Sequence, residues 1–140
     1  MVPSAESQRV VNAKKFFLSY SARELDGGLE LLSPDVVYSV PGRSKLSGVF
    51  RGRDEVRRHI VKLLDFTRGT FEVLKWMEWM VGESHITVLQ YAQAQAHGDI
   101  YRGHHLYLLE SDAEDRLSSI KVFFEDQAAA ERFFDWDIGD

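Results

Sequence analysis

Apolar side chains between residues 10 and 20 recur three and four positions apart, which predicts an amphipathic helix. A second, shorter helix is expected over about residues 23–32, where three leucines share one face. A third helix is predicted from near residue 53 to the residues before Gly69, because glycine is common just beyond a helix end.

After residue 70 the hydrophobic period changes from 3.6 residues to 2, which predicts strands. These strands are expected over residues 71–79, 84–97, 100–109 and 117–125, with a hairpin turn at Gly98-Asp99. A short β-branched strand is expected at 36–40, a loop at 43–52, and a terminal helix at 127–134. Helices that precede a long antiparallel meander predict an α+β fold, in which the helices cover one face of a curved sheet.

The length of 140 residues corresponds to a single domain, 1–140. The net charge of −5 and the absence of a basic run argue against nucleic-acid binding. No apolar run approaches the roughly 18 to 20 residues that span a bilayer, and no signal-peptide pattern is present, so we expect a cytoplasmic protein that does not bind membranes. The aromatic content of 12% suggests a large apolar interior or an aromatic-lined cavity.

Sequence motifs for cofactors and metals are absent. The chain has no cysteine, no G-x-G-x-x-G, no phosphate-binding loop and no H-E-x-x-H, so we expect no cofactor. His104 and His105 are neighbours on a predicted strand and point to opposite faces, so they cannot chelate one ion together. We therefore expect no metal site.

The side-chain alternation offers one candidate proton-transfer residue. His104 shares a strand face with Leu106 and Leu108, which fits either a core-edge histidine or a general acid–base group in an apolar pocket. Asp126, at the end of the adjacent strand, is either a base or orienting carboxylate, or the N-cap of the following helix. The sequence Asp126-Gln127-Ala128 favours the cap.

Two further assignments concern the faces of the sheet. The strand 84–97 has a small-residue face of alanines and a face that carries Tyr91, Gln93 and Gln95, which lie either toward solvent or a partner, or toward a cavity. Trp76 and Trp79 are expected on opposite faces, one in the core and the other at an interface or cavity mouth.

Residues 41–56 read Pro-Gly-Arg-Ser-Lys-Leu-Ser-Gly-Val-Phe-Arg-Gly-Arg-Asp-Glu-Val. This stretch resembles the P-G-x-S-x-L-x-G-x-[YF]-R-G-R-[DE]-x-[IV] loop of the SnoaL-like branch of the nuclear-transport-factor-two-like superfamily, which includes ketosteroid isomerases and polyketide cyclases. Residues 124–129 are similar to the closing strand, turn and helix of that family, and the order of elements matches over about residues 7–135. The resemblance implies a cone (a cystatin-like, SnoaL-like roll): a strongly bent, mostly antiparallel sheet wrapped around the N-terminal helices, with a pocket at one end.

The resemblance excludes two activities. The tyrosine and the base of ketosteroid isomerases correspond here to Phe16 and Val40, and the later acid corresponds approximately to His104, which argues against steroid isomerisation. Limonene-epoxide-hydrolase relatives need an arginine and two aspartates, but Gln93, Gln95 and Phe123 stand at the matching positions. The histidine and aspartate of polyketide cyclases leave His104 and Asp126 as the candidate catalytic pair.

Three functions remain open: a small-molecule acid–base enzyme (a lyase, isomerase or cyclase) acting on an apolar carbonyl-bearing ligand, a non-catalytic binding protein for such a ligand, and a dimerising scaffold with a vestigial pocket. Family members pair through the outer face of the sheet, so we expect a homodimer with Trp76 or Trp79 and Tyr107 at the contact. The expected cavity-lining residues are Phe16, Tyr20, Val40, Phe50, His59, Tyr91, Gln93, His104 and Phe124.

Overall fold

The computed structural model describes residues 7–20 and 24–134. The elements are α1 (Gln8–Leu18), α2 (Leu25–Leu29), β1 (Leu32–Val40), β2 (Gly48–Arg51), α3 (Gly52–Phe66), β3 (Glu72–Val81), β4 (His85–Ala96), β5 (Asp99–Ser111), β6 (Leu117–Phe124) and α4 (Gln127–Phe134). The strands form one curved sheet in the order β2-β1-β6-β5-β4-β3, in which β1 and β6 are parallel and the other neighbours antiparallel. The predicted α+β fold is confirmed. Among the described helices none has the length and apolar character needed to cross a membrane.

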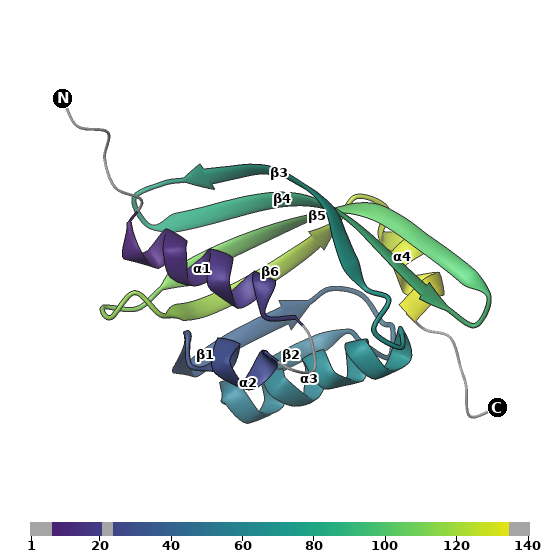
Figure 1. The fold of residues 1–140 in the computed structure, drawn as a ribbon, viewed down its shortest axis with the longest axis horizontal. Helices are drawn as coiled ribbons and strands as arrows, with labels where there is room; N and C mark the ends of the chain where they lie inside the picture. The colour runs from purple at the N-terminus through teal and green to yellow at the C-terminus, as the bar shows by residue number, and fades with distance from the viewer. Residues whose placement is uncertain (1–6, 21–23, 135–140) are drawn as a thin grey trace.

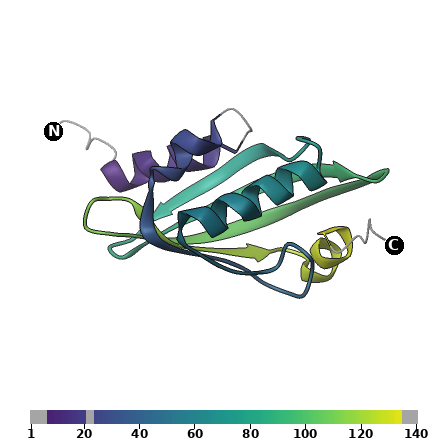
Figure 2. The same cartoon turned by 90° about the horizontal axis from the view of Figure 1, so that it is seen from below.

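Helices α1, α2 and α3 lie on one side of the sheet (Figures 1 and 2). The buried positions of α1 are those that the helical period predicts, including Val10, Ala13 and Phe16. The buried positions of α3 include Val56 and Ile60, which face β1 and β2. The concave side of the sheet and the apolar stripes of these helices therefore enclose one core.

The segment predicted as a loop over 43–52 contains strand β2, which pairs with the end of β1. The prediction of a loop throughout is wrong because a strand of four residues is too short to show a period. Two glycines bracket it at positive φ, Gly48 at 147° and Gly52 at 84°, and allow the sharp reversals into and out of the strand.

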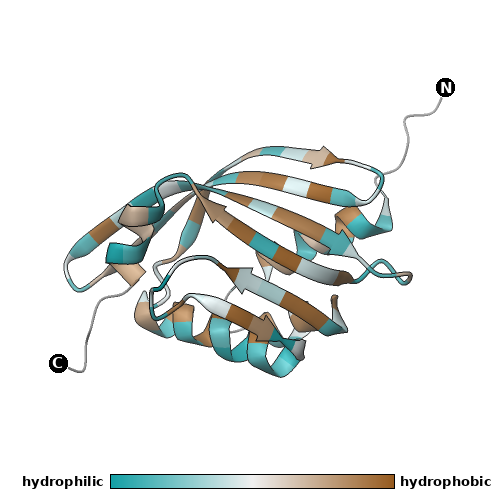
Figure 3. Ribbon diagram, turned by 180° about the vertical axis from the view of Figure 1, so that it is seen from behind, coloured by the Kyte–Doolittle hydropathy of each residue, from teal (hydrophilic) through white to brown (hydrophobic). Residues whose placement is uncertain are grey.

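The β4–β5 hairpin fixes which side chains face the interior. His97 and Gly98 have φ of 53° and 81°, as a type I′ hairpin turn requires. The register pairs Ala92 with Gly103 and Gln90 with His105, and these four residues are among the buried positions of the two strands. Figure 3 shows hydrophobic and hydrophilic positions alternating along much of the sheet, as expected when one face is covered.

The small residues of β4 mark the face against which the terminal helix packs. Ala94 and Ala96 belong to a cluster with Tyr101 and with Phe133 and Phe134 of α4. A methyl side chain leaves room for aromatic rings above it, so the small-residue face is the inner face of the sheet.

Strand β3 departs from simple alternation. Register shifts interrupt its pairing with β4 between Val73 and Lys75 and between Trp76 and Glu78. The second of these bulges lies between Trp76 and Trp79 and brings them to the same face, where their rings lie 5.7 Å apart and both contact Phe17. The expectation that the two tryptophans lie on opposite faces is therefore wrong.

Candidate ligand-binding cavity

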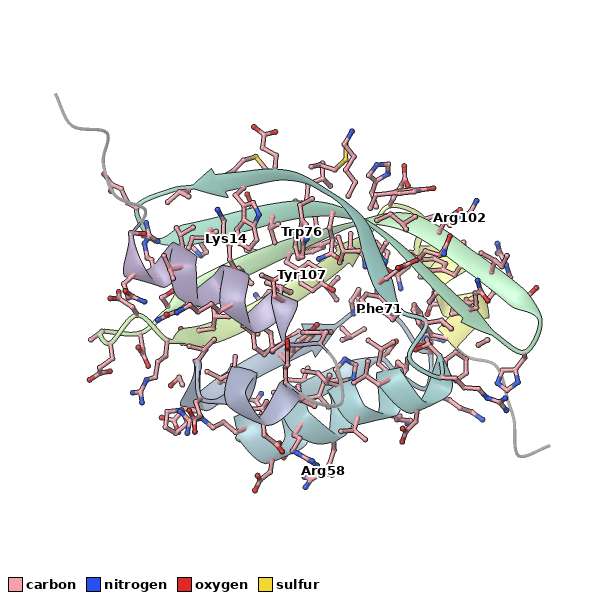
Figure 4. The ribbon with its side chains drawn as sticks, viewed as in Figure 1. Lys14, Arg58, Phe71, Trp76, Arg102 and Tyr107 are labelled. Atoms are coloured by element: carbon pink, nitrogen blue, oxygen red, sulfur yellow. The ribbon has the colours of Figure 1, made fainter. Side chains whose placement is uncertain are left out.

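Two pockets lie between the helices and the concave face of the sheet. The outer pocket, of about 230 Å³, is lined by Phe17, Leu18, Tyr20, Phe71, Glu72, Val73, Trp76, Gln90 and Tyr107. The inner pocket, of about 30 Å³, is lined by Tyr38, Val40, Leu46, His59, Leu63, Phe71, His105, Tyr107, Val122, Phe124 and Phe134. Phe71 and Tyr107 line both pockets; Figure 4 shows Tyr107 and Trp76 on the side of the sheet that faces α1, with Phe71 nearer to α3.

His105 is almost completely enclosed in the inner pocket, with 2% of its surface exposed. Its Nε2 lies 2.8 Å from the hydroxyl of Tyr101, while its Nδ1 has no hydrogen-bond partner. The ring lies between the rings of Phe71 and Phe124. Burial lowers the pKa of His105 to about 4, with a smaller contribution from His104. The imidazole is therefore neutral at pH 7.

His59 reaches the same inner pocket from α3. Its ring stacks on Phe50, with centroids 4.3 Å apart, and its Nδ1 has no hydrogen-bond partner. Burial, with a smaller contribution from the charge of Lys62, lowers the pKa of His59 to about 4. Two neutral imidazoles from different elements thus line one cavity.

Gln90 contributes an unpaired acceptor to the outer pocket. The residue is 1% exposed, and its Oε1 has no hydrogen-bond partner. Within the described ranges, the buried side-chain polar atoms without a partner are Nδ1 of His59, Oε1 of Gln90 and Nδ1 of His105. Buried polar groups are normally paired, and all three of these atoms belong to residues that line the two pockets.

Three tyrosines, Tyr20, Tyr38 and Tyr107, also line the pockets. The hydroxyls of Tyr20 and Tyr38 lie 2.9 Å apart, and Tyr107 couples electrostatically to Tyr38. Burial raises the pKa of all three hydroxyls well above the ordinary value. They therefore stay protonated and act as neutral donors and acceptors.

The expected lining residues divide into three groups. Tyr20, Val40, His59 and Phe124 line the pockets. Phe16 is fully buried in the core beside Tyr20, and Phe50 packs against the ring of His59. The remaining residues, Tyr91, Gln93 and His104, lie elsewhere.

His104 lies on the outer face of the sheet, so the expectation that it lines the cavity is corrected. Its Nδ1 donates to Oε1 of Glu125 at 2.9 Å, and its ring lies beside Tyr91 on the same face. The hydrogen bond from His104 lowers the pKa of the Glu125 carboxyl. The reason is the register: the buried Ala92–Gly103 pair places odd-numbered residues of β5 inside, and His104 is even-numbered.

Gln93 and Asp126 also lie outside the pockets. Gln93 accepts a hydrogen bond from Arg102 at 2.6 Å and donates one to Glu72 at 3.3 Å, on the outer face. Asp126 is exposed, and its Oδ1 accepts a hydrogen bond from the backbone N–H of Ala129 at 3.0 Å. Asp126 therefore caps α4, as the sequence favoured, and the structure does not bring His104 and Asp126 together over a cavity.

The same face assignment corrects the expected dimer contacts. Tyr107 is buried on the inner face, and Trp76 and Trp79 pack against Phe17 beneath α1. None of these three rings is on the outer surface of the sheet.

Sequence reasoning missed Gln90, His105, Tyr101 and Phe71 as site residues. The sequence does contain a signal for Gln90 and His105. Gln90 falls on the same face of β4 as the alanines, and His105 falls on the same face of β5 as Gly103; these small residues mark the covered face of the sheet. Among the described residues, no group of three or more histidine or acidic side chains is positioned to hold a metal ion.

Comparison with known proteins agrees with this geometry. The model of the SnoaL-like domain matches residues 13–113. No curated protein matches the sequence. A protein with a cystatin-like fold from Xanthomonas campestris is similar in structure, with a TM-score of 0.84 and 21% identity over 93% of this chain and 100% of that one.

Two similar structures contain small molecules. TerC co-crystallized with polyporic acid has a TM-score of 0.79 and 14% identity, over 93% of this chain and 100% of that chain. RV0760c from Mycobacterium tuberculosis in complex with estradiol-17beta-hemisuccinate has a TM-score of 0.72 and 14% identity, over 84% of this chain and 94% of that chain. At these identities the similarity establishes the shared fold.

Proposed function

The chain belongs to the SnoaL-like domain family, and from that premise we propose that it is an acid–base enzyme that acts on a small, mostly apolar ligand with a carbonyl group. The ligand occupies the outer pocket and reaches the inner pocket by displacing the ring of Phe71, which lines both. The family alone does not choose this function, because one fold supports many. The choice rests on the residues inside the cone.

One observation carries the proposal: the unpaired buried polar atoms of His59, Gln90 and His105 all belong to pocket-lining residues. Leaving a buried polar group unpaired costs about 1–3 kcal/mol. Apolar pockets with a few convergent polar groups are typical of small-molecule sites. A ligand that pairs these atoms recovers the cost upon binding.

The two neutral imidazoles supply the chemistry. His105 donates a hydrogen bond through Nδ1 to the carbonyl oxygen, and Nδ1 of His59 accepts a proton from the carbon next to the carbonyl. The electron pair of the broken C–H bond forms the carbon–carbon double bond of an enolate, and the carbonyl π pair moves to oxygen, whose negative charge the hydrogen bond from His105 stabilises. Return of a proton to carbon reverses the step, and return at another position would give an isomer.

The names of two similar structures support a small organic ligand. TerC was co-crystallized with polyporic acid, and RV0760c was solved in complex with estradiol-17beta-hemisuccinate. The outer pocket of this chain is aromatic, because Phe17, Tyr20 and Trp76 line it. Such a lining fits a flat, apolar ligand body.

The test is proton exchange at a simple ketone. 1-Indanone in D₂O is expected to incorporate deuterium at the carbon next to its carbonyl faster with the protein than in matched buffer, as followed by proton NMR. Binding is measured separately by thermal shift, since a ligand that binds only the folded chain raises its melting temperature. Binding without faster exchange would contradict the enzyme and support the non-catalytic binding protein. Neither binding nor exchange would contradict both.

We also propose that a second copy of this chain covers the outer face of the sheet. Phe123, Leu106 and Leu89 lie opposite one another on β6, β5 and β4, and Phe123 is 48% exposed. Met77 and Met80 of β3 are also exposed. We call these five residues the outer patch. An apolar patch on a sheet face can meet the same patch of a second copy in a two-fold dimer.

The dimer predicts a mass in solution near twice the 16.1 kDa of one chain, as measured by light scattering at micromolar concentration. Phe123→Glu places a charge in the outer patch and is expected to give monomers. Val49→Glu makes the same change at an exposed position of β2, across the sheet, and should leave the dimer intact. A wild-type mass near that of one chain would contradict the dimer.

A further inference from the structure

The cross-strand pair Gln90–His105 has unpaired groups on both members. The two residues are directly opposite in the β4–β5 register, and both are almost completely buried. Side chains opposite each other in an antiparallel pair have Cβ atoms about 4.5–5.5 Å apart. Gln90 lines the outer pocket and His105 the inner pocket, so a ligand that spans the two pockets can meet the unpaired Oε1 of Gln90 and Nδ1 of His105 with groups that lie close together.

Tyr101 determines whether the unpaired Nδ1 of His105 acts toward the ligand as a hydrogen-bond donor or as an acceptor. The Tyr101 hydroxyl is buried and lies 2.8 Å from Nε2 of His105. A phenol is the stronger donor of the two groups and a neutral imidazole nitrogen the stronger acceptor, so the hydroxyl donates to Nε2. In a neutral ring the single proton then lies on Nδ1, and the unpaired atom is a donor.

Gly103 makes this arrangement possible. It lies between Tyr101 and His105 on the inner face of β5, and a Cβ atom at this position would be 2.8 Å from the Tyr101 hydroxyl oxygen. Any larger residue would push the Tyr101 ring away from the imidazole. The glycine thus keeps space for the hydrogen bond that sets the tautomer.

We infer that the Gln90–His105 pair recognises a hydroxyketone, whose carbonyl accepts from Nδ1–H of His105 and whose neighbouring hydroxyl donates to Oε1 of Gln90, with Tyr101 as the positioning residue that fixes the tautomer. The inference rests on the proposed function and names its substrate class. It assigns Tyr101 and Gly103 a role through His105, without contact to the ligand.

The role of Tyr101 is tested without any ligand. In ¹⁵N-labelled protein at neutral pH, the shifts of the two ring nitrogens of His105 report which one carries the proton. The wild type is expected to show the proton on Nδ1, while Tyr101→Phe and Gly103→Ala are expected to lose that preference. Tyr91→Phe, on the outer face beside His104, is the matched control and should leave His105 unchanged. A proton on Nε2 in the wild type would overturn the positioning role, whether or not the variants fold.

The substrate class is tested with three matched probes: 2-hydroxy-1-indanone, 1-indanone and 2-indanol. The hydroxyketone is expected to bind about tenfold more tightly than the ketone, the amount that corresponds to one buried hydrogen bond. Gln90→Leu should remove this advantage, whereas Gln93→Leu on the outer face should preserve it. Equal affinity of the wild type for the ketone and the hydroxyketone would overturn the assignment. Failure of all three probes to bind would contradict the proposed function as well, while the tautomer measurement would still decide the role of Tyr101.

Discussion

Each face of the β4–β5 hairpin carries a histidine and a glutamine, but the burial and the hydrogen bonding of these residues differ between the two faces. On the outer face, His104 is paired with Glu125, and Gln93 is paired with Arg102 and Glu72. On the inner face, His105 and Gln90 are almost completely buried, and each has an atom without a partner. A histidine and a glutamine are thus satisfied where water is available and left unsatisfied where it is not.

This difference points to the function of the inner face. A fold selected only for stability would place the unpaired groups outside, where solvation removes their cost, or would replace them by apolar residues. Functional sites are where sequences depart from such rules. His104 and Gln93 on the outer face therefore serve as controls for His105 and Gln90 on the inner face, because each control has the same side chain as its counterpart.

The largest expected difference between the faces is in turnover. His105→Gln removes the imidazole and its Nδ1–H and should slow deuterium exchange into 1-indanone by about 100-fold or more, within the range that general acid–base groups contribute. His104→Gln, on the outer face, should change the rate less than about twofold. Equal losses in both variants, or none in either, would contradict the comparison between the faces.

The next largest expected effect is on the pH dependence of the free energy of unfolding, to which His105 contributes. The pKa of His105 is about 4 in the folded chain against an ordinary 6.5, so between these values the unfolded chain binds a proton that the folded chain does not. The free energy of unfolding therefore falls as the pH decreases from about 6.5 to about 4, by up to about 3 kcal/mol for one such histidine. His59, with a pKa of about 4, adds a second contribution of the same sign.

Urea unfolding of the wild type and two variants across this pH range isolates the contribution of His105. His105→Gln should flatten the pH dependence by about half, leaving the part due to His59. His104→Gln keeps both buried imidazoles and should retain the slope between pH 6.5 and 5. A wild type whose stability does not change over this interval would show that the interior imidazoles become protonated without cost.

How much of this was predictable differs between the fold and the site. The helical and strand periods, together with the loop at 41–56, predicted the α+β fold, because burial of one face fixes the period of an element. The prediction of the site depended on whether the even- or the odd-numbered residues of β5 face inward. The sequence pattern is ambiguous on this point, because Leu106 and Leu108 on one face are as apolar as Tyr107 and Leu109 on the other. The outer patch makes both faces hydrophobic, so hydrophobicity alone could not separate His104 from His105.

The alternation of hydrophobic and polar residues could not predict which faces Trp76 and Trp79 occupy. The bulge between Trp76 and Glu78 brings Trp76 and Trp79 to one face, although their odd spacing would place them on opposite faces of a regular strand. A bulge adds a residue without any clear mark in the local sequence. The register became clear only from pairing with β4, which involves residues far along the chain.

A smaller effect on the free energy of unfolding is expected from the side-chain amide of Gln90, whose Oε1 has no hydrogen-bond partner. Gln90→Met replaces it with an apolar side chain of similar length and should raise the free energy of unfolding by about 1–3 kcal/mol. Gln93→Met removes exposed hydrogen bonds and should change stability by about 0.5 kcal/mol or less. Thermal and urea unfolding at neutral pH measure both. A destabilised Gln90→Met would mean that water or protein already satisfies Oε1 in the free chain.

The smallest expected effect concerns Asp126, which the sequence left open between base and cap. Asp126→Ala removes the oxygen that accepts from the Ala129 N–H and should destabilise the chain by about 1 kcal/mol, with faster amide exchange in the first turn of α4. Asp126→Asn keeps an accepting oxygen, and asparagine caps helices about as well as aspartate, so it should restore most of that loss. Neither change should alter deuterium exchange into 1-indanone, because Asp126 is exposed and lies outside both pockets. Restored stability in Asp126→Asn together with a turnover reduced tenfold or more would instead assign the carboxylate a part in the chemistry.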